Sequence, residues 1–360
     1  MSTATPTPPS PHLPVRPQWL ALRTEEILEP ELPIVDPHHH LWDRPGARYL
    51  LDEILEDLRS GHRVESTVFV QCRSMYRADG PEPMRALGEV EFVNGIAAQS
   101  ASGIYGPVRV CEGIVAGADL SLGAAVEPVL EAMARAAPDR MRGIRNQAAW
   151  HPHPDVVSAP VPALEGLLVR PSFLEGVRVL PRFGLVLDVW AYHTQLDEVL
   201  ALARACPDTT IVVNHLCGPI GVGPYAGRRD EVFAAWKPRI AELAALPNTV
   251  MKLGGLAMRV GGLKFHEAPQ PPASAALAEA FAPWIRESIE RFGAHRCMFE
   301  SNFPVDKGMV GYAVLWNAFK RLAAGASADE KTALFSGCAR RVYRLPAPAR
   351  RDGAGANVSA

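Results

Sequence analysis

The chain has no uninterrupted apolar run of the roughly 18 to 20 residues that a membrane-spanning helix requires. No G-x-G-x-x-G or Walker A pattern follows an apolar segment, so nothing indicates a nucleotide-binding loop. The 37 Lys and Arg residues are balanced by 39 Asp and Glu residues, and no basic block stands out. We therefore expect neither a membrane protein nor a nucleic-acid-binding protein.

Cysteine is scarce, and its spacing excludes another kind of site. None of the six cysteines belongs to a Cys-x-x-Cys pair, the spacing typical of zinc and redox sites. Four of them lie in or beside apolar segments, which favours buried free thiols. The stretch from Met1 to Pro17 is rich in Pro, Ser and Thr and lacks the apolar segment of a secretory signal. Both features predict a cytoplasmic protein.

The composition divides the chain into one large central region and two irregular ends. Residues 1–30 are Pro-rich and predict an extended arm that lies across a domain or subunit surface. Residues 346–360 are rich in Pro, Ala and Gly and predict a flexible tail. Between them, residues 31–345 form the predicted domain, and the 48% hydrophobic content of the chain is enough for a sizeable core.

Short β-rich runs alternate with longer helical patterns throughout the central region. This alternation predicts a parallel sheet, and eight such units predict an α/β protein with a single (β/α)8 TIM barrel. A doubly wound open sheet is the alternative. The predicted strands are 33–38, 66–72, 108–115, 141–147, 185–192, 209–215, 249–255 and 296–302. The predicted helices are 50–60, 83–101, 123–137, 195–205, 230–246, 275–292, 309–324 and 327–344, and an insertion at 148–182 has room for one short helix.

Three consecutive histidines, His38, His39 and His40, end the first predicted strand. Alternate side chains on a strand point the same way, so His38 and His40 share one side and His39 points to the other. Two imidazoles on one side of a strand can present two nitrogen ligands to a metal, or two hydrogen-bonding groups to a polarised substrate.

Polar residues also stand at the ends of other predicted strands, where barrels of this kind form their active sites. Arg73, Arg145, His193, His215 and Lys252 all lie at or near such positions. Converging imidazoles either bind a divalent cation or act as acids, bases and hydrogen-bond donors. We expect Arg73, Arg145, His193 and Lys252 to contact the substrate.

On these motifs the chain resembles the amidohydrolase-related TIM-barrel hydrolases, which include 2-pyrone-4,6-dicarboxylate lactonase and L-fuconolactonase. The resemblance covers roughly residues 30–345. It is carried by residues 34–43 (IVDPHHHLWD), 143–145, 211–219, 248–256, 296–305 and 335–345.

The resemblance implies roles for individual residues. His38 and His40 match the His-x-His of strand one, and His215 matches the histidine of strand six, so these three are the implied catalytic residues and metal ligands. Some members of the family bind a divalent metal, whereas the pyrone dicarboxylate lactonases look able to work without one. One zinc or manganese ion and a metal-free site therefore both stay open.

Asn302 departs from the family pattern, which typically has at this position an Asp that takes the proton from the attacking water. An amide cannot act as a general base near neutral pH, and the loss of a carboxylate weakens a dication site. Glu300 would face the same side one layer deeper, and Asp306 lies just past the strand end. We expect one of these two acids to be the base. We favour Asp306, because a deep Glu300 would be held in a buried ion pair.

These observations predict a hydrolase that acts on a small carboxylated or polyhydroxylated lactone, or on a related cyclic ester. Histidines, with or without a metal, would stabilise the developing oxyanion. A non-oxidative decarboxylase and a catalytically inactive ligand-binding barrel are the alternatives, and amide hydrolysis also stays open. The expected partners are a small-molecule substrate and, where the arm or the insertion forms an interface, a second copy of the chain.

Overall fold

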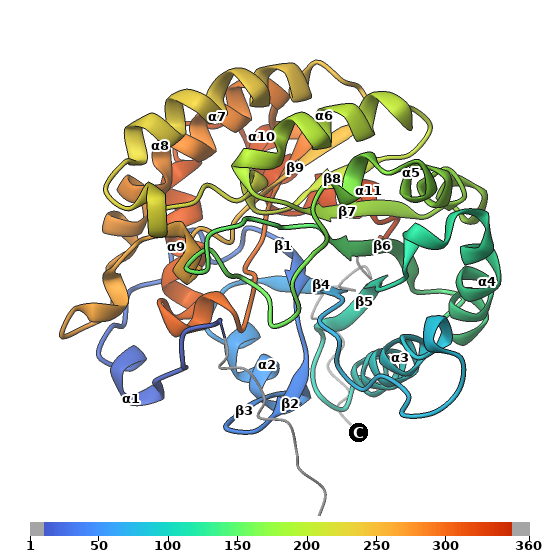
Figure 1. Cartoon of the computed structure of the whole chain (residues 1–360). Coiled ribbons are helices and arrows are strands. Elements are labelled where there is room, and N and C mark those ends of the chain that lie inside the picture. The colour runs from blue at the N-terminus through green and yellow to red at the C-terminus, as the bar shows by residue number, and fades with distance from the viewer. Residues whose placement is uncertain (1–10, 348–360) are drawn as a thin grey trace, which may run out of the picture.

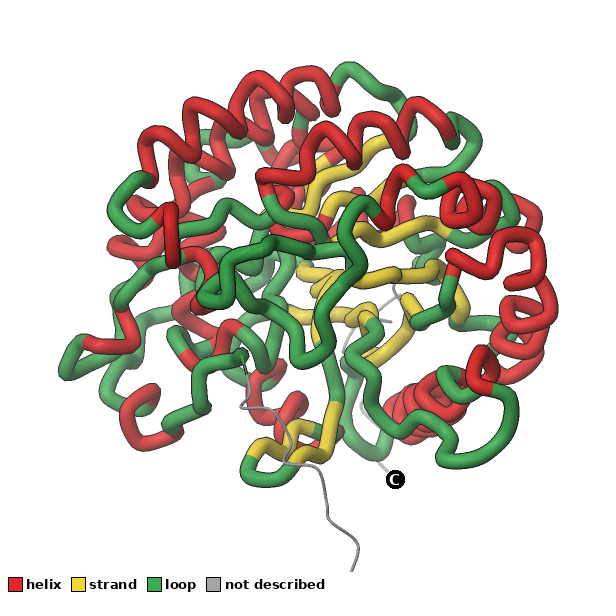
Figure 2. The backbone as a smooth tube through the Cα atoms, viewed as in Figure 1, coloured by secondary structure: helices red, strands yellow, loops and turns green. Residues whose placement is uncertain are grey.

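The computed structural model describes residues 11–347 and has eight parallel strands in one sheet, in chain order, with helices around them (Figure 1). Figure 2 shows the strands at the centre and most helices outside them. The predicted TIM barrel is confirmed. Its strands are β1 (Ile34–His39), β4 (Val64–Val70), β5 (Arg109–Ala116), β6 (Met141–Gln147), β7 (Val186–Trp190), β8 (Ile211–Val213), β9 (Thr249–Leu253) and β10 (Cys297–Phe299).

The helices follow the predicted ranges. The eight predicted segments correspond to α2 (Leu51–Leu58), α3 (Leu87–Ala101), α4 (Glu127–Ala136), α6 (Leu196–Ala205), α7 (Arg229–Ala244), α8 (Ser274–Phe292), α9 (Tyr312–Leu322) and the pair α10 (Ala328–Thr332) and α11 (Cys338–Val342), which a π-helical turn joins. The insertion contains α5 (Pro171–Val177). The sequence did not indicate α1 (Pro17–Leu20) in the arm, or the hairpin of β2 (Trp42–Arg44) and β3 (Ala47–Tyr49). Residues 1–10 of the predicted arm and 348–360 of the predicted tail lie outside the described residues.

The barrel closes between β10 and β1 through hydrogen bonds beyond the end of β10. The backbone N–H of Asn302 donates to the carbonyl oxygen of His38 at 2.9 Å, and the N–H of His40 donates to that of Phe303 at 2.8 Å. The buried carboxylate of Asp36 accepts from the N–H of Ser301 at 3.0 Å. The seam therefore fixes the first histidine motif against the last strand.

The barrel interior is apolar at one end and polar at the other. Inward-facing side chains from the strands pack on α11 and the residues after it, which plug the amino-terminal end of the barrel. This cluster includes Val35, Val70, Val115, Val186, Val212, Val250, Met298, Val342 and Tyr343. Two residues further along β7, β9 and the chain after β10, the inward positions carry Asp188, Lys252 and Glu300. The alternation of strand residues thus places charged groups directly below the site.

No helix among residues 11–347 is long and apolar enough to cross a membrane. The six cysteines are free and buried, as their apolar neighbours predicted.

Candidate active site

The three histidines of β1 point as the alternation of the strand predicts. His39 is turned into the barrel wall, where its Nε2 lies 2.8 Å from the hydroxyl of Thr67. The Nδ1 of His40 lies 2.7 Å from the carbonyl oxygen of Val70. Because a carbonyl only accepts, this nitrogen carries the hydrogen, and the lone pair of His40 is on Nε2.

His215 follows β8 in an unusual backbone turn. His215, Leu216 and Cys217 have φ angles of 55°, 55° and 54°, and Gly218 continues the turn at 42°. Non-glycine residues rarely adopt this left-handed region, and such strain is concentrated at functional sites. The turn points the His215 ring toward Glu300, and the backbone N–H of His215 donates to the same carboxylate at 3.2 Å.

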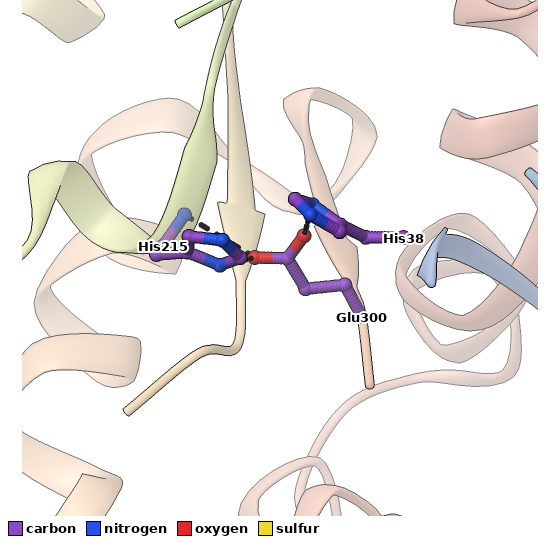
Figure 3. A group of neighbouring side chains, drawn as sticks. All are labelled: His38, His215 and Glu300. Atoms are coloured by element: carbon purple, nitrogen blue, oxygen red, sulfur yellow. Dashed lines mark hydrogen bonds and ion pairs between the residues drawn. The ribbon is translucent and has the colours of Figure 1, made fainter. Parts of the chain in front are cut away.

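Glu300 joins His38 to His215 (Figure 3). One carboxylate oxygen lies 2.6 Å from Nδ1 of His215, and the other lies 2.7 Å from Nδ1 of His38. Because a carboxylate only accepts, the hydrogen bond from His215 places the hydrogen of that ring on Nδ1 and its lone pair on Nε2. For His38, the guanidinium N–H of Arg145 at 3.3 Å from Nε2 favours the same tautomer. Burial lowers the pKa of His38, His40 and His215, so all three are neutral at pH 7.

Two glycines after β9 make room for this pair. An added Cβ at Gly254 would lie 2.3 Å from the carbonyl oxygen of Glu300, and one at Gly255 would lie 2.2 Å from Nδ1 of His215. Gly255 also has a φ of +68°. Any side chain here would displace the histidine or the glutamate, so Gly254 and Gly255 are part of the site although they carry no chemistry.

Buried cations and anions surround the histidines. Nζ of Lys252 lies 2.8 Å from Oδ2 of Asp188 and donates to the carbonyl oxygen of Pro37 at 2.8 Å. The guanidinium of Arg145 donates to Gln71 and lies 3.3 Å from Nε2 of His38. With Glu300 in the same layer, two formal positive charges face two formal negative charges, as burial of charge requires.

The residues after β10 place Asp306 behind Asn302. The amide nitrogen of Asn302 donates to Oδ1 of Asp306 at 2.8 Å, and the N–H of Ala257 donates to Oδ2 at 3.2 Å. Burial raises the pKa of Asp306 to about 8. Both candidate bases are covered by a layer of other side chains. Glu300 is enclosed by His38 and His215, and Asp306 by Asn302.

A cavity of about 40 Å³ opens at the carboxyl ends of the strands, and we call it the reaction chamber. Several predicted residues line it. The lining is His12, His40, Trp42, Arg44, Cys72, Arg73, Arg145, Gln147, Ser158, Ala159, Pro160, Trp190, His215, Met258, Asn302 and Val305. Of the predicted residues, His38, Glu300 and Asp306 lie behind this lining and contact residues that form it. Lys252 lies deeper and contacts Asp188 and the carbonyl oxygen of Pro37.

His193 lies away from the chamber. Its Nδ1 accepts the N–H of Ile220 at 3.3 Å, and its ring packs on Tyr225 with 5.0 Å between centroids. Burial lowers its pKa to about 4. The strand ends at Trp190, earlier than predicted, so Trp190 rather than His193 reaches the chamber.

Among the chamber residues that were not singled out from the sequence are Trp42, Arg44 and His12. Trp42 and Arg44 belong to the unpredicted hairpin, although they directly follow the histidine motif. His12 comes from the arm, and its ring stacks on Trp42 with 5.9 Å between centroids. The position of Trp42 and Arg44 directly after the histidine motif could have indicated them, whereas nothing local in the sequence indicates His12.

His38, His40 and His215 are the predicted metal ligands. Among the described residues, His38, His215 and Glu300 bring three candidate ligand atoms within 4.8 Å of one another. The Glu300 oxygens, however, are already at hydrogen-bonding distance from both Nδ1 atoms. His40 does not belong to this group, so an ion could contact all three rings only after a shift of side chains. Metal-binding histidines usually donate their other N–H to a carboxylate or carbonyl and bind the ion through the remaining nitrogen. His38, His40 and His215 meet this requirement, and Arg145 faces the Nε2 of His38.

Comparison with known proteins gives a consistent assignment. The model of a family described as amidohydrolase (Amidohydro_2) matches residues 35–345. The uncharacterized protein y4mH of Sinorhizobium fredii is 29% identical over 337 residues, covering 88% of this chain and 99% of that protein. An L-fucono-1,5-lactonase of Burkholderia multivorans is 30% identical over 179 residues, which is 49% of this chain and 57% of the lactonase.

A solved structure supports the fold. An amidohydrolase from Burkholderia multivorans with bound zinc matches with a TM-score of 0.65 and 24% identity, covering 87% of this chain and 99% of that chain.

Proposed function

The chain belongs to the amidohydrolase family, and from this premise we propose that it hydrolyses a small lactone that carries a carboxylate group. The observation that carries the proposal is the composition of the chamber wall, where His40, His215 and three arginines face one small space. The similarity to an L-fucono-1,5-lactonase supports a lactone as the substrate class.

The positive charge that binds the substrate carboxylate comes from Arg44, Arg73 and Arg145. Guanidinium groups hold carboxylates through paired hydrogen bonds, and they keep their charge when partly buried. Arg145 is fixed by Gln71, and Arg44 donates to the carbonyl oxygen of Cys72 at 2.8 Å. Arg73 is exposed at the mouth of the chamber. A carboxylate held between these groups would fix the orientation of the lactone ring.

His215 is the proposed general base. Its neutral Nε2 takes a proton from water as the water oxygen bonds to the lactone carbonyl carbon. Glu300 accepts the Nδ1–H and stabilises the imidazolium that forms, which is the role of the carboxylate in a catalytic triad. When the ring C–O bond breaks, the imidazolium returns the proton to the leaving alkoxide. Glu300 thus acts through His215.

Asn302 and Asp306 have a supporting role in this scheme. Asp306 accepts one N–H of the Asn302 amide and so fixes the orientation of that amide in the chamber wall. The second N–H can donate to the oxyanion that develops on the carbonyl oxygen, together with Arg145. This assignment replaces the expectation that Asp306 itself takes the proton.

A divalent ion is compatible with the same residues. Held by His38, His40 and His215 after a shift of side chains, an ion such as zinc would polarise the carbonyl and lower the pKa of bound water, and His215 would then be a ligand rather than the base. The zinc in the related Burkholderia amidohydrolase supports this ion. Arg145 would have to withdraw from His38 to admit it.

The test is hydrolysis of a panel of carboxylated γ- and δ-lactones, followed by proton release in a weakly buffered solution. We expect His215→Asn to lower kcat by about 100-fold or more, and the exposed control His295→Asn to match the parent protein. Release of carbon dioxide instead of acid would favour decarboxylation. No turnover by the folded protein, with and without added zinc, would overturn the proposal.

A further inference from the structure

A second and larger cavity adjoins the reaction chamber. It has a volume of about 520 Å³ and lies at the ends of β4, β5 and β6, under part of the 148–182 insertion. Arg73, Arg145 and Gln147 line both cavities, so their side chains form the boundary between them. We call this space the outer cavity.

The reaction chamber and the outer cavity differ in volume, and this difference indicates different roles for them. A buried water needs about 10 to 15 Å³ of such space, so a chamber of about 40 Å³ accommodates a few water-sized groups. It can hold the attacking water and the reacting ester, but not a complete ring with substituents. The outer cavity falls in the range of about 300 to 1,000 Å³ that is typical of small-molecule sites.

The outer cavity changes character along its length. Next to the chamber its wall is cationic, with Arg73 and Arg145. Further away the wall combines apolar side chains (Tyr76, Pro83, Leu122, Pro162, Leu164 and Leu167) with the polar residues Arg85, Ser121 and Asn146. Leu164 is 54% exposed and so presents apolar surface at the cavity rim. Glu82 and Asp119 also line the cavity, and Asp119 is engaged by the N–H of Ser121 at 2.9 Å.

We propose that the outer cavity binds an apolar, ring-bearing substituent of the substrate, whose carboxylate is held at the boundary by Arg73 and Arg145. The substrate class is then an aryl-substituted carboxylated lactone rather than a simple sugar lactone. This inference rests on the proposed function for the reacting end. The apolar recognition itself is independent of any chemical step.

Binding tests this recognition without turnover. We compare acetate with 3-phenylpropanoate by calorimetry and expect the phenyl acid to bind at least tenfold more tightly. Ala163→Trp, at a half-buried position in the cavity wall, should remove this preference. Val169→Trp in the same insertion lies outside the lining and is the matched control. Leu164→Asp is a second variant, at an exposed position that tolerates a polar side chain, and should weaken the phenyl acid by a similar factor.

Kinetics then separate this inference from the proposed function. With carboxylated lactones that differ only in a phenyl group, Ala163→Trp should lower kcat/KM about tenfold for the phenyl lactone and less than twofold for the plain one. Turnover with no preference for the phenyl group, or an equal loss for both lactones, overturns the outer cavity as a subsite. Tight phenylpropanoate binding without lactone turnover supports the subsite and overturns the lactonase proposal. Equal binding of the two acids overturns the subsite whatever the activity.

Discussion

Replacing Gly255 by alanine should disable the site from a position that carries no functional group. The added Cβ would lie 2.2 Å from Nδ1 and 2.4 Å from Cγ of His215. Atoms at these separations overlap, so the ring must move. The movement breaks the 2.6 Å contact between His215 and Glu300, because the carboxylate is enclosed and cannot follow.

The expected magnitude has two parts. An alanine at a φ of +68° costs about 1 kcal/mol from backbone strain alone. Overpacking against a buried ring adds about 1 to 3 kcal/mol. For catalysis, a displacement of about 1 Å at a reacting group costs roughly 100-fold in rate. Gly103 provides the matched control, because its φ is +78° but its added Cβ would meet nothing within 4 Å.

The assay is urea unfolding of both variants, together with kcat on the best lactone of the panel. We expect Gly103→Ala to lose only the backbone part of the stability and to keep its activity. Gly255→Ala should lose more stability and about 100-fold in kcat, with KM changed much less. If folded Gly255→Ala keeps kcat within threefold of the parent protein, the His215–Glu300 contact does not position the base.

Three further perturbations address the charges around the site. Glu300→Gln should lower kcat by about 100-fold or more, because an amide stabilises the His215 imidazolium poorly; an unchanged pH profile with full activity would contradict this. Arg145→Gln should raise the affinity for zinc about tenfold or more, since it removes a buried positive charge 3.3 Å from Nε2 of His38; competition with a zinc-binding dye measures this, and unchanged affinity would contradict it. Burial lowers the pKa of His39 to about 3. Between about pH 6.5 and pH 3, His39 therefore binds a proton only in the unfolded chain, and the free energy of unfolding falls by about 1.4 kcal/mol for each pH unit of acidification. His39→Gln should flatten the fall of the urea-unfolding free energy between pH 6.5 and 5 by that amount, and parallel curves would contradict the assignment.

The fold could be predicted because it depends on a pattern repeated along the whole chain. Eight alternations of apolar runs and helical periods leave few arrangements other than a barrel. The directions of His38 and His39 followed from the same regularity, since neighbours on a strand point to opposite sides.

The features of the site that the sequence did not predict depend on local departures from regular strand geometry. His215 reaches Glu300 through a left-handed turn, and three consecutive non-glycine residues in that conformation cannot be inferred from spacing. His193 was expected in the pocket, but β7 ends at Trp190 and the chain turns away before reaching it. His12 belongs to the arm before the barrel, and only tertiary packing brings its ring against Trp42.

Asn302 and Arg145 have a combined consequence for the charge of the site. The family resemblance places a carboxylate at position 302, where it would offset part of the charge of a dication. Here that negative charge is missing, and the guanidinium of Arg145 faces the histidine nitrogen that such an ion would use. With Lys252 paired to Asp188, the buried layer is formally neutral without an ion. An ion that entered would therefore add uncompensated charge unless Arg145 withdrew or Asp306 lost a proton. The layer around the imidazoles is thus charge-balanced without an ion, and Arg145 is the cation that would have to move before a dication could bind to His38.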